Sequence, residues 1–118
     1  MTLLSTLTAA ALLLAASGPV SVSVETGGDD ALTQRLAEEV RAIFAETPGY
    51  SADASPRLTV LIPTHVDWRE TGGRIRVSYR AELTAGVRTL RRTGSCWEDE
   101  MRVCAGQIVK AAKTMKPH

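Results

Sequence analysis

The sequence is poor in aromatic residues, cysteine and histidine, and each shortage argues against a class of function. Its five aromatic residues are two tryptophans, two tyrosines and one phenylalanine. Trp68 and Tyr79, which stand beside arginines, are expected in the core, so no exposed aromatic side chains interleave with the arginines as platforms on which nucleobases could stack. Nucleic acid is therefore the least expected partner. A zinc site would need His65 and His118 as ligands beside the two cysteines, and we expect neither a metal nor another cofactor.

Motifs that identify enzymes are also missing. The adjacent glycines, Gly27-Gly28 and Gly72-Gly73, match neither of the glycine-rich patterns that cradle phosphate groups. The two cysteines are separated by seven residues, whereas redox motifs of the thioredoxin type place two residues between them. Sequence motifs therefore identify no catalytic site.

The first 17 residues have the character of a secretory leader. They carry no charged side chain, and residues 7–16 form an apolar run of about ten residues. Such a run suits a signal peptide, because a membrane span needs about 20 apolar residues. Small residues at Ala15 and Ser17 predict cleavage before Gly18, which leaves residues 18–118 as one domain without a transmembrane span. Because the first residues lack Lys and Arg, the alternative is a buried or membrane-lying N-terminal helix.

Charge is unevenly distributed along the chain. Residues 18–56 carry seven acidic side chains against two arginines, whereas residues 57–92 carry eight arginines against three acidic side chains. The net charge of the whole chain is only +1. A basic segment therefore lies inside a nearly neutral domain.

The first half of residues 18–118 predicts a strand, a helix and a loop. Valines alternate with serines over residues 20–24, which is the pattern of a half-buried strand. Apolar residues recur every three or four positions over residues 30–46 and form the stripe of an amphipathic helix, which Asp29 or Asp30 can cap. Residues 49–56 are small and polar, and we expect them to form a loop.

A strand with one irregularity is expected over residues 57–69. Most of its even-numbered residues are apolar, and Trp68 is expected in the core with them. Pro63 cannot donate a hydrogen bond to a neighbouring strand, so this strand is expected at a sheet edge or with a bulge. The glycines Gly72-Gly73 predict a hairpin turn to the next strand.

The remaining elements complete a two-layer fold. Residues 74–83 alternate without interruption, with Tyr79 among the inward-facing apolar residues and arginines on the opposite face. A bend is expected at residues 84–86, followed by a further strand over residues 87–92, whose inward and outward positions the pattern leaves open. Thr93-Gly94 predicts another turn, and an amphipathic helix is expected from residue 98 or 99 to about 115. The order β-α-β-β-β-α predicts an α+β sandwich, with a mostly antiparallel sheet covered by two helices on one face.

The two cysteines allow two incompatible local structures. An even number of cysteines in an exported chain favours a disulfide between Cys96 and Cys104. Ser95 and Glu98 match the S-x-x-E capping box, and a helix starting there would hold the two Cα atoms about 12 Å apart, too far for a bridge. We predict the disulfide, with Cys96 in extended chain before the helix. Two separate buried thiols and a redox or metal role are the alternatives.

His65 and Asp67 form one candidate for catalysis. Residues two apart on a strand project from the same face, and a carboxylate that orients an imidazole is a recurring catalytic arrangement. Ser78 and Ser95 are available as nucleophiles, but nothing in the pattern selects either. Polar side chains on an exposed strand face explain the pair equally well, so a small hydrolase is the alternative function.

Arginines on the uncovered sheet face form the main candidate site. Guanidinium groups suit phosphate and carboxylate, so we expect a non-enzymatic exported domain that binds an envelope protein or an anionic lipid or polymer. The edge strand with Pro63 is expected to accept a strand from such a protein. A solvated sheet face, in a purely structural envelope protein, is the alternative. The predicted arginine set is Arg69, Arg74, Arg76, Arg80, Arg88, Arg91 and Arg92.

The predicted element order resembles that of small bacterial envelope proteins. The lipopolysaccharide-assembly lipoprotein and the auxiliary lipoproteins of lipid-transport ABC systems share a sheet covered by two helices. The segment Gly94-Ser95-Cys96-Trp97, followed by Cys104, is also similar to uncharacterised exported bacterial proteins. This resemblance implies an envelope location, but no cysteine follows the leader as lipidation would require, and no functional residue can be carried over.

Overall fold

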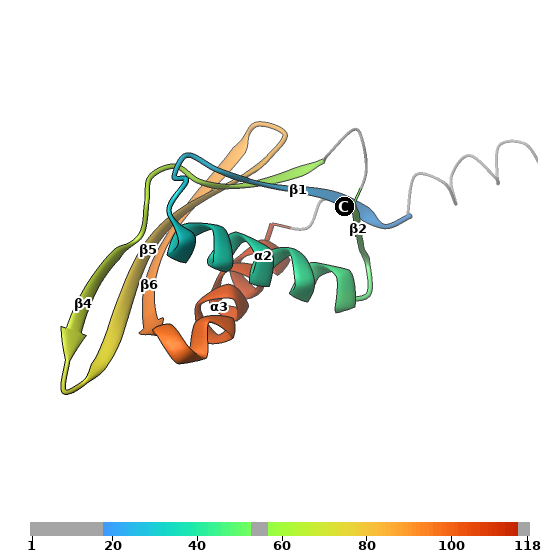
Figure 1. The fold of residues 1–118 in the computed structure, drawn as a ribbon. Coiled ribbons are helices and arrows are strands. Elements are labelled where there is room, and N and C mark those ends of the chain that lie inside the picture. Colours follow the sequence, from blue (N-terminus) through green and yellow to red (C-terminus); the bar gives the residue numbers. More distant parts are fainter. Residues whose placement is uncertain (1–17, 53–56, 116–118) are drawn as a thin grey trace, which may run out of the picture.

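The α+β class is confirmed by the computed structural model, which describes residues 18–52 and 57–115. The leader predicted for residues 1–17 lies outside the described residues. The elements in chain order are β1 (Val20–Thr26), α2 (Ala31–Glu46), β2 (Tyr50–Ala52), β3 (Leu58–Ile62), β4 (Asp67–Thr71), β5 (Arg74–Ala85), β6 (Arg88–Trp97), the short 3₁₀ helix η1 (Glu98–Glu100) and α3 (Met101–Lys113) (Figure 1).

Strand β5 organises the six-stranded sheet. One of its edges pairs antiparallel with β6 over ten residues, from Arg76 opposite Trp97 to Ala85 opposite Arg88. Its other edge pairs antiparallel with β4 near the start of β5 and with β3 near its end. Strand β1 runs parallel to β3 and to the short β2. The sheet is therefore mixed, with three antiparallel and two parallel pairings.

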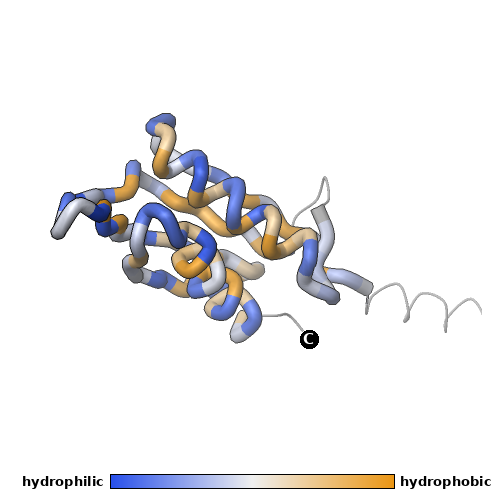
Figure 2. Tube along the Cα trace, turned by 60° about the horizontal axis from the view of Figure 1, so that its bottom comes forward, coloured by the Kyte–Doolittle hydropathy of each residue, from blue (hydrophilic) through white to orange (hydrophobic). Residues whose placement is uncertain are grey.

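Both helices cover the same face of the sheet. Helix α2 packs beside β1 and β2, α3 packs beside β6, and the two helices pack against each other. Apolar positions of the helices and strands face the space between these layers (Figure 2). The fully buried side chains there come from both layers, and the largest are Leu36, Val40, Leu58, Val60, Ile62, Val77, Leu83 and Ile108.

The alternation of residues 75–83 is confirmed. Val77, Tyr79, Ala81 and Leu83 are each 3% exposed or less, and Ile75 is half-buried near the start of the strand. The intervening residues of β5 are exposed or half-buried on the other face. A strand with one apolar face thus packs that face against two amphipathic helices, as the sequence predicts.

A polar network fixes the start of α2. Asp30 caps the helix by accepting a hydrogen bond from the Thr33 N–H, at 3.1 Å, and one from the Thr33 hydroxyl, at 2.7 Å. The buried Thr33 hydroxyl in turn accepts the Val66 N–H at 2.9 Å, which joins the helix to the chain before β4. Burial raises the pKa of Asp30, but the bonds from Thr33 outweigh it and the net pKa is lowered.

The disulfide between Cys96 and Cys104 is confirmed, and the competing capping box is absent. Cys96 lies in extended chain near the end of β6, 5.6 Å by Cα atoms from Cys104 in the first turn of α3. The α-helix starts at Met101, after η1, so the two cysteines do not share a helix. Both are buried, at 3% and 0% exposure, so the bridge is part of the core.

The hairpin of β4 and β5 extends beyond the helices (Figure 1). Gly72 and Gly73 form its turn with φ angles of 57° and 80°, a conformation that favours glycine. Trp68 pairs with the buried Val77 and therefore has the expected parity, but it is 61% exposed. Its predicted place in the core is wrong, because β4 lies where the sheet outruns its covering helices.

Strand boundaries differ from the prediction in three places. Residues 57–69 form two strands rather than one: β3 ends at Ile62, directly before Pro63, and lies between β1 and β5, so Pro63 marks neither an edge strand nor a bulge. Residues 50–52 of the expected loop form β2, and residues 53–56 lie outside the description. Strand β6 continues to Trp97, past the turn expected at residues 93–94.

None of the described helices has the length and hydropathy that crossing a membrane requires.

Candidate functional site

The uncovered face of β4, β5 and β6, here named the open face, carries the candidate site. Directly opposite residues of paired strands share a face, so the observed registers decide which side chains belong to it. Five of the seven predicted arginines do: Arg69 from β4, Arg74, Arg76 and Arg80 from β5, and Arg91 from β6.

Arg88 and Arg92 lie on the face of the sheet opposite to the open face. They pair with the buried Ala85 and Ala81, so they belong to the helix-side face of β6, where both are nevertheless exposed. The seven arginines therefore do not form one surface. Two of them lie at the sheet edge, on the opposite face from the other five.

Two of the open-face arginines are held by neighbouring side chains. The Cζ atoms of Arg74 and Arg76 lie 4.3 and 4.9 Å from the ring centroid of Trp97, within cation–π distance. Arg74 also pairs with Asp99 at 2.8 Å, and Arg76 donates to the Ser95 hydroxyl at 3.0 Å. Trp97 thus supports both guanidinium groups. This role of Trp97 was not predicted, although an arginine-rich strand next to a tryptophan is a usable signal.

A shallow depression crosses the open face and is here named the arginine trough, formed by Asp67, Arg69, Arg76, Ser78 and Arg80. Two adjoining hollows compose it, of about 630 Å³ on the Arg69 and Arg76 side and about 420 Å³ on the Arg80 side, and both are lined by Asp67 and Ser78. The residues of β4 lie opposite those of β5, with Asp67 facing Ser78 and Arg69 facing Arg76. Both ends of the trough are therefore cationic.

Arginines of the trough are not neutralised by the described protein. No carboxylate lies within 4 Å of the guanidinium groups of Arg69, Arg76 or Arg80 among residues 18–52 and 57–115. Arg91, by contrast, is 3.6 Å from Glu82. Arg69 and Arg76 occupy directly opposite register positions, and like charges at such positions are unfavourable in a sheet.

His65 and Asp67 line the same hollow, together with Ser78. Contrary to the prediction, they do not share a strand, because His65 precedes β4. In the described part of the chain, the imidazole forms no hydrogen bond with Asp67 or Ser78, and the Ser95 hydroxyl instead accepts from Arg76. The described residues also contain no cluster of three or more His, Cys, Asp and Glu side chains that could hold a metal ion. His65, Asp67 and Ser78 therefore lie near one another but lack the hydrogen bonds that link the members of a catalytic triad.

A polar network lies behind the trough, on the helix side of the sheet. The Tyr79 hydroxyl donates to Gln107 Oε1 at 2.9 Å, and Gln107 Nε2 reaches the Ser95 carbonyl at 3.4 Å. A side chain at Gly94 would collide with Gln107 and the Tyr79 ring, which explains a glycine inside β6. Burial raises the pKa of Tyr79, while the nearby Arg92 acts in the opposite direction.

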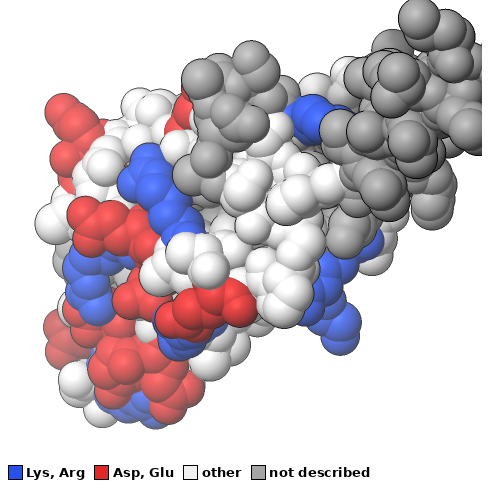
Figure 3. All heavy atoms as spheres, turned by 90° about the vertical axis from the view of Figure 1, so that its right-hand side faces the viewer, with Lys and Arg blue, Asp and Glu red and all other residues white. Residues whose placement is uncertain are grey.

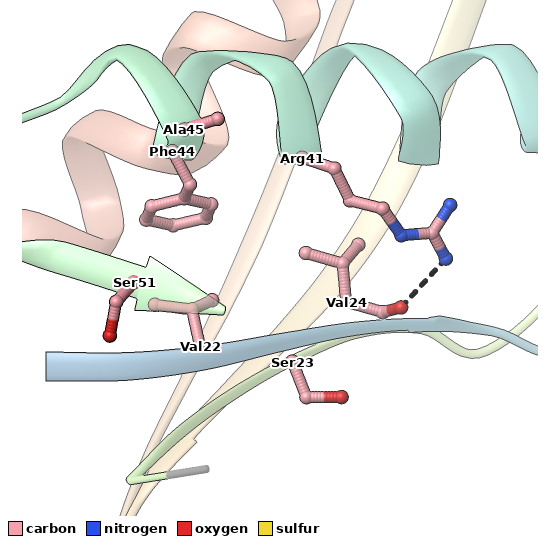
Figure 4. A pocket seen from close by; sticks show the side chains of 7 residues that line it. All are labelled: Val22, Ser23, Val24, Arg41, Phe44, Ala45 and Ser51. Atoms are coloured by element: carbon pink, nitrogen blue, oxygen red, sulfur yellow. Dashed lines mark hydrogen bonds between the residues drawn. The ribbon is translucent and has the colours of Figure 1, made fainter. Parts of the chain in front are cut away.

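A second hollow, of about 320 Å³, lies between β1 and the C-terminal half of α2 (Figure 4). It is mostly apolar, with Val22, Val24 and Phe44 among its lining. Arg41 reaches across it and donates to the Val24 carbonyl at 2.8 Å. The Arg41 guanidinium group is therefore hydrogen-bonded to the backbone of β1 at one side of this hollow.

Charges are mixed on the side of the molecule that Figure 3 shows. One side of the molecule shows acidic and basic side chains interspersed at one end, without a continuous patch of one sign (Figure 3). Several of these form pairs between elements: Arg102 of α3 contacts Glu39 and Glu46 of α2, and Arg35 of α2 contacts Glu98 of η1. The trough differs from these surfaces because its arginines lack such partners.

Comparisons with known proteins show the fold alone. No protein-family model matches the chain, and no curated protein matches it. The crystal structure of an uncharacterized protein is similar, with a TM-score of 0.53 at 15% sequence identity, over 83% of this chain and 95% of that one. This likeness supports the architecture and assigns no site. The predicted similarity to lipopolysaccharide-assembly proteins gains no support from it.

Proposed function

We propose that this protein is an exported, non-enzymatic binding domain whose arginine trough holds a segment of an anionic polymer. The observation that carries the proposal is the facing pair Arg69 and Arg76, with Arg80 further along the same face and no carboxylate within 4 Å of any of the three among the described residues. An anion in the trough would form charge-assisted hydrogen bonds and relieve the repulsion between the arginines.

The spacing of charges in the trough favours a polymer over a compact anion. Arg76 and Arg80 are four residues apart on β5, which corresponds to about 13 Å. Asp67 lies between the cationic ends and would repel a single anion centred there. A chain with repeated phosphate, sulfate or carboxylate groups meets both ends and leaves the middle to neutral groups.

Binding of fluorescein-labelled heparin, followed by anisotropy, tests this proposal. In Arg69→Gln/Arg80→Gln, losing about 1 kcal/mol for each guanidinium predicts about 30-fold weaker binding. The matched control is Lys110→Gln/Lys113→Gln, which removes two exposed cations from α3 and is expected to bind like the wild type. Equal weakening in both variants would show attraction by net charge alone and contradict a built site.

The source of the anion is decided by a parallel titration. Vesicles of phosphatidylglycerol compete with heparin if lipid headgroups fill the trough, whereas vesicles of phosphatidylcholine serve as the neutral control. The polymer proposal expects heparin to bind in the presence of either vesicle. Displacement by phosphatidylglycerol alone would identify a lipid surface as the partner.

Export is the second part of the proposal. Its support is the leader-like composition of residues 1–17 and a buried disulfide, a bond rare in reducing compartments. Intact mass spectrometry of the protein from the periplasm or medium should show cleavage before Gly18 and a mass two hydrogens below that of the reduced chain. A full-length, reduced cytoplasmic protein would contradict export.

A hydrolase built on His65 and Asp67 is less well supported. General-base catalysis needs a hydrogen bond between the base and its nucleophile, and His65 and Ser78 line one hollow without such a bond among the described contacts. A purely structural envelope protein is the remaining alternative, and absence of any anion binding would favour it.

A further inference from the structure

The outer edge of β6 is a second feature of the molecule that can bind a partner, independently of the trough. Strand β6 pairs with β5 along one edge only, and no described strand pairs with its other edge. An unpaired edge presents backbone N–H and C=O groups to a further strand.

The hairpin geometry identifies which groups point outward. Gly86 and Val87 form a two-residue turn, with φ of 63° at Gly86, between the paired residues Ala85 and Arg88. Partners that flank such a turn exchange both hydrogen bonds, and the next pair does not, in alternation along the ladder. Thr89, Arg91, Thr93 and Ser95 therefore direct their N–H and C=O groups away from β5.

Side chains of the covering helices occupy part of the sheet's outer edges. Gln107 of α3 reaches the Ser95 carbonyl at 3.4 Å, in agreement with the outward direction of that carbonyl. Arg41 of α2 donates to the Val24 carbonyl of β1, past the three residues of β1 that pair with β2 (Figure 4). Among the described residues, no segment outside the sheet forms a hydrogen bond with the backbone of Thr89, Arg91 or Thr93. The stretch from Thr89 to Thr93, here named the free edge of β6, is the part left open.

Charge on the free edge defines its occupant. Strand β6 carries Arg88, Arg91 and Arg92 and no acidic residue. Arg91 belongs to the open face and Arg88 and Arg92 to the helix-side face, so an added strand meets positive charge on both of its faces. A second copy of this chain would bring β6 arginines against β6 arginines, which is unfavourable. Adjacent acidic residues in an added strand would place one carboxylate on each face.

We propose that the free edge of β6 adds an extended polypeptide strand whose centre carries adjacent acidic residues. The partner is therefore an acidic protein segment, held by backbone hydrogen bonds to Thr89, Arg91 and Thr93 and selected by the arginines that flank them. This goes beyond the proposed trough, because it uses a strand edge and different side chains.

Amide hydrogen exchange, read residue by residue by NMR, tests the proposal on the disulfide-bonded protein. The probe is a synthetic peptide of threonine and valine with a run of glutamates at its centre. In the free protein, the amides of Thr89, Arg91 and Thr93 should exchange fast, whereas those of Leu90 and Arg92 are protected by β5. The peptide should slow the three outward amides by more than about tenfold and leave the alternate ones unchanged.

Two variants of one residue separate backbone pairing from general attraction. Thr93→Pro removes an outward N–H without removing a bond to β5, because proline is tolerated on edge strands. Thr93→Val keeps the N–H and is the matched control. The acidic peptide should bind Thr93→Val like the wild type and Thr93→Pro at least about tenfold more weakly. A peptide with lysines in place of the glutamates should not bind.

Several results would overturn the proposal. Equal binding of the lysine peptide, equal binding by the proline and valine variants, or peptide binding without slower exchange at the outward amides would each do so. If Thr93→Pro does not fold, the exchange data and the lysine peptide still decide. Concentration-dependent dimerisation that slows the same amides without peptide would make a second copy the occupant. The variant Arg69→Gln/Arg80→Gln should keep the peptide response, so failure at the edge and failure of the trough are distinguishable.

Discussion

Replacing both Cys96 and Cys104 with alanine removes the covalent link between the end of β6 and the first turn of α3. The bridge closes a short loop, with a sequence separation of eight residues. Loop-closure entropy for that separation predicts a stabilisation of about 2.5 kcal/mol. Loss of two buried sulfur atoms adds to the cost, because both side chains are in the core.

Equilibrium urea denaturation of the oxidised wild type and the double alanine variant measures this effect. The free energy of unfolding should fall by about 2.5–4 kcal/mol, a large part of the 5–15 kcal/mol typical of small domains. Chemically reduced wild type is the control for the missing sulfur atoms, and it should lose the loop-closure part alone. Hydrogen exchange should accelerate most in η1 and the start of α3, which the bridge anchors.

A loss below about 1 kcal/mol would contradict a stabilising role of the bridge, because helix packing alone would then hold α3 in place. Uniform acceleration of exchange across the sheet would also contradict it. The segment between the cysteines contains Trp97 and Asp99, which contact Arg74. The bridge is therefore expected to affect the open face, and the double variant should also hold Arg74 less rigidly.

The remaining predictions concern the core and its polar groups. Asp30→Ala removes the cap of α2 and should cost about 1 kcal/mol by urea denaturation, whereas Asp30→Asn should keep most of it. Because the folded pKa of Asp30 is lowered, its stabilisation is present above about pH 4 and is lost as the pH falls through the folded pKa, a loss that Asp30→Asn should not show. Tyr79→Phe breaks the hydrogen bond to Gln107 and should lower the free energy of unfolding by about 1 kcal/mol. Because the folded pKa of Tyr79 is raised, the stability of the wild type should fall as the pH rises above about 10, and that of the variant should fall less. Leu83→Ala, at a fully buried position, should cost about 2–5 kcal/mol, and no measurable loss would contradict its place in the core.

Periodicity predicted the elements that span the core. The alternation from Val77 to Leu83 was correct because one helix-covered face requires it, and the turn at Gly72 and Gly73 was correct because both glycines adopt positive φ. The disulfide was also predicted from the sequence, although the capping box favoured a different local structure. The alternation, the glycine pair and the cysteine pair were each decided by residues close together in the sequence.

Features that depend on tertiary context were not predictable in the same way. Alternation gave Trp68 the correct face, but it does not show where the helices end and the sheet continues uncovered. Gly94 was read as a turn, whereas it makes room for Tyr79 and Gln107 inside β6. The short strand β2 depends on pairing with β1 rather than on its own three residues.

The sequence predicted the type of candidate site but not all of the residues that form it. The sequence indicated arginines on an uncovered face, and five of the seven lie there. Arg91 and Arg92 are adjacent in β6, so an extended strand cannot place both on one face. The sequence left open which of them faces outward, and the register set by the turn at Gly86 and Val87 places Arg88 and Arg92 on the helix-side face. Which arginines lack a carboxylate partner depends on contacts between elements, and these follow only from the fold.

The most direct test of the arginine trough is NMR observation of arginine side-chain Nε–H signals during a titration with heparin. We expect the signals of Arg69, Arg76 and Arg80 to shift together and saturate at one ratio, while that of Arg102, which is paired with Glu39 and Glu46, stays in place. Equal shifts of all arginine signals, or no shift of the three trough signals, would contradict it.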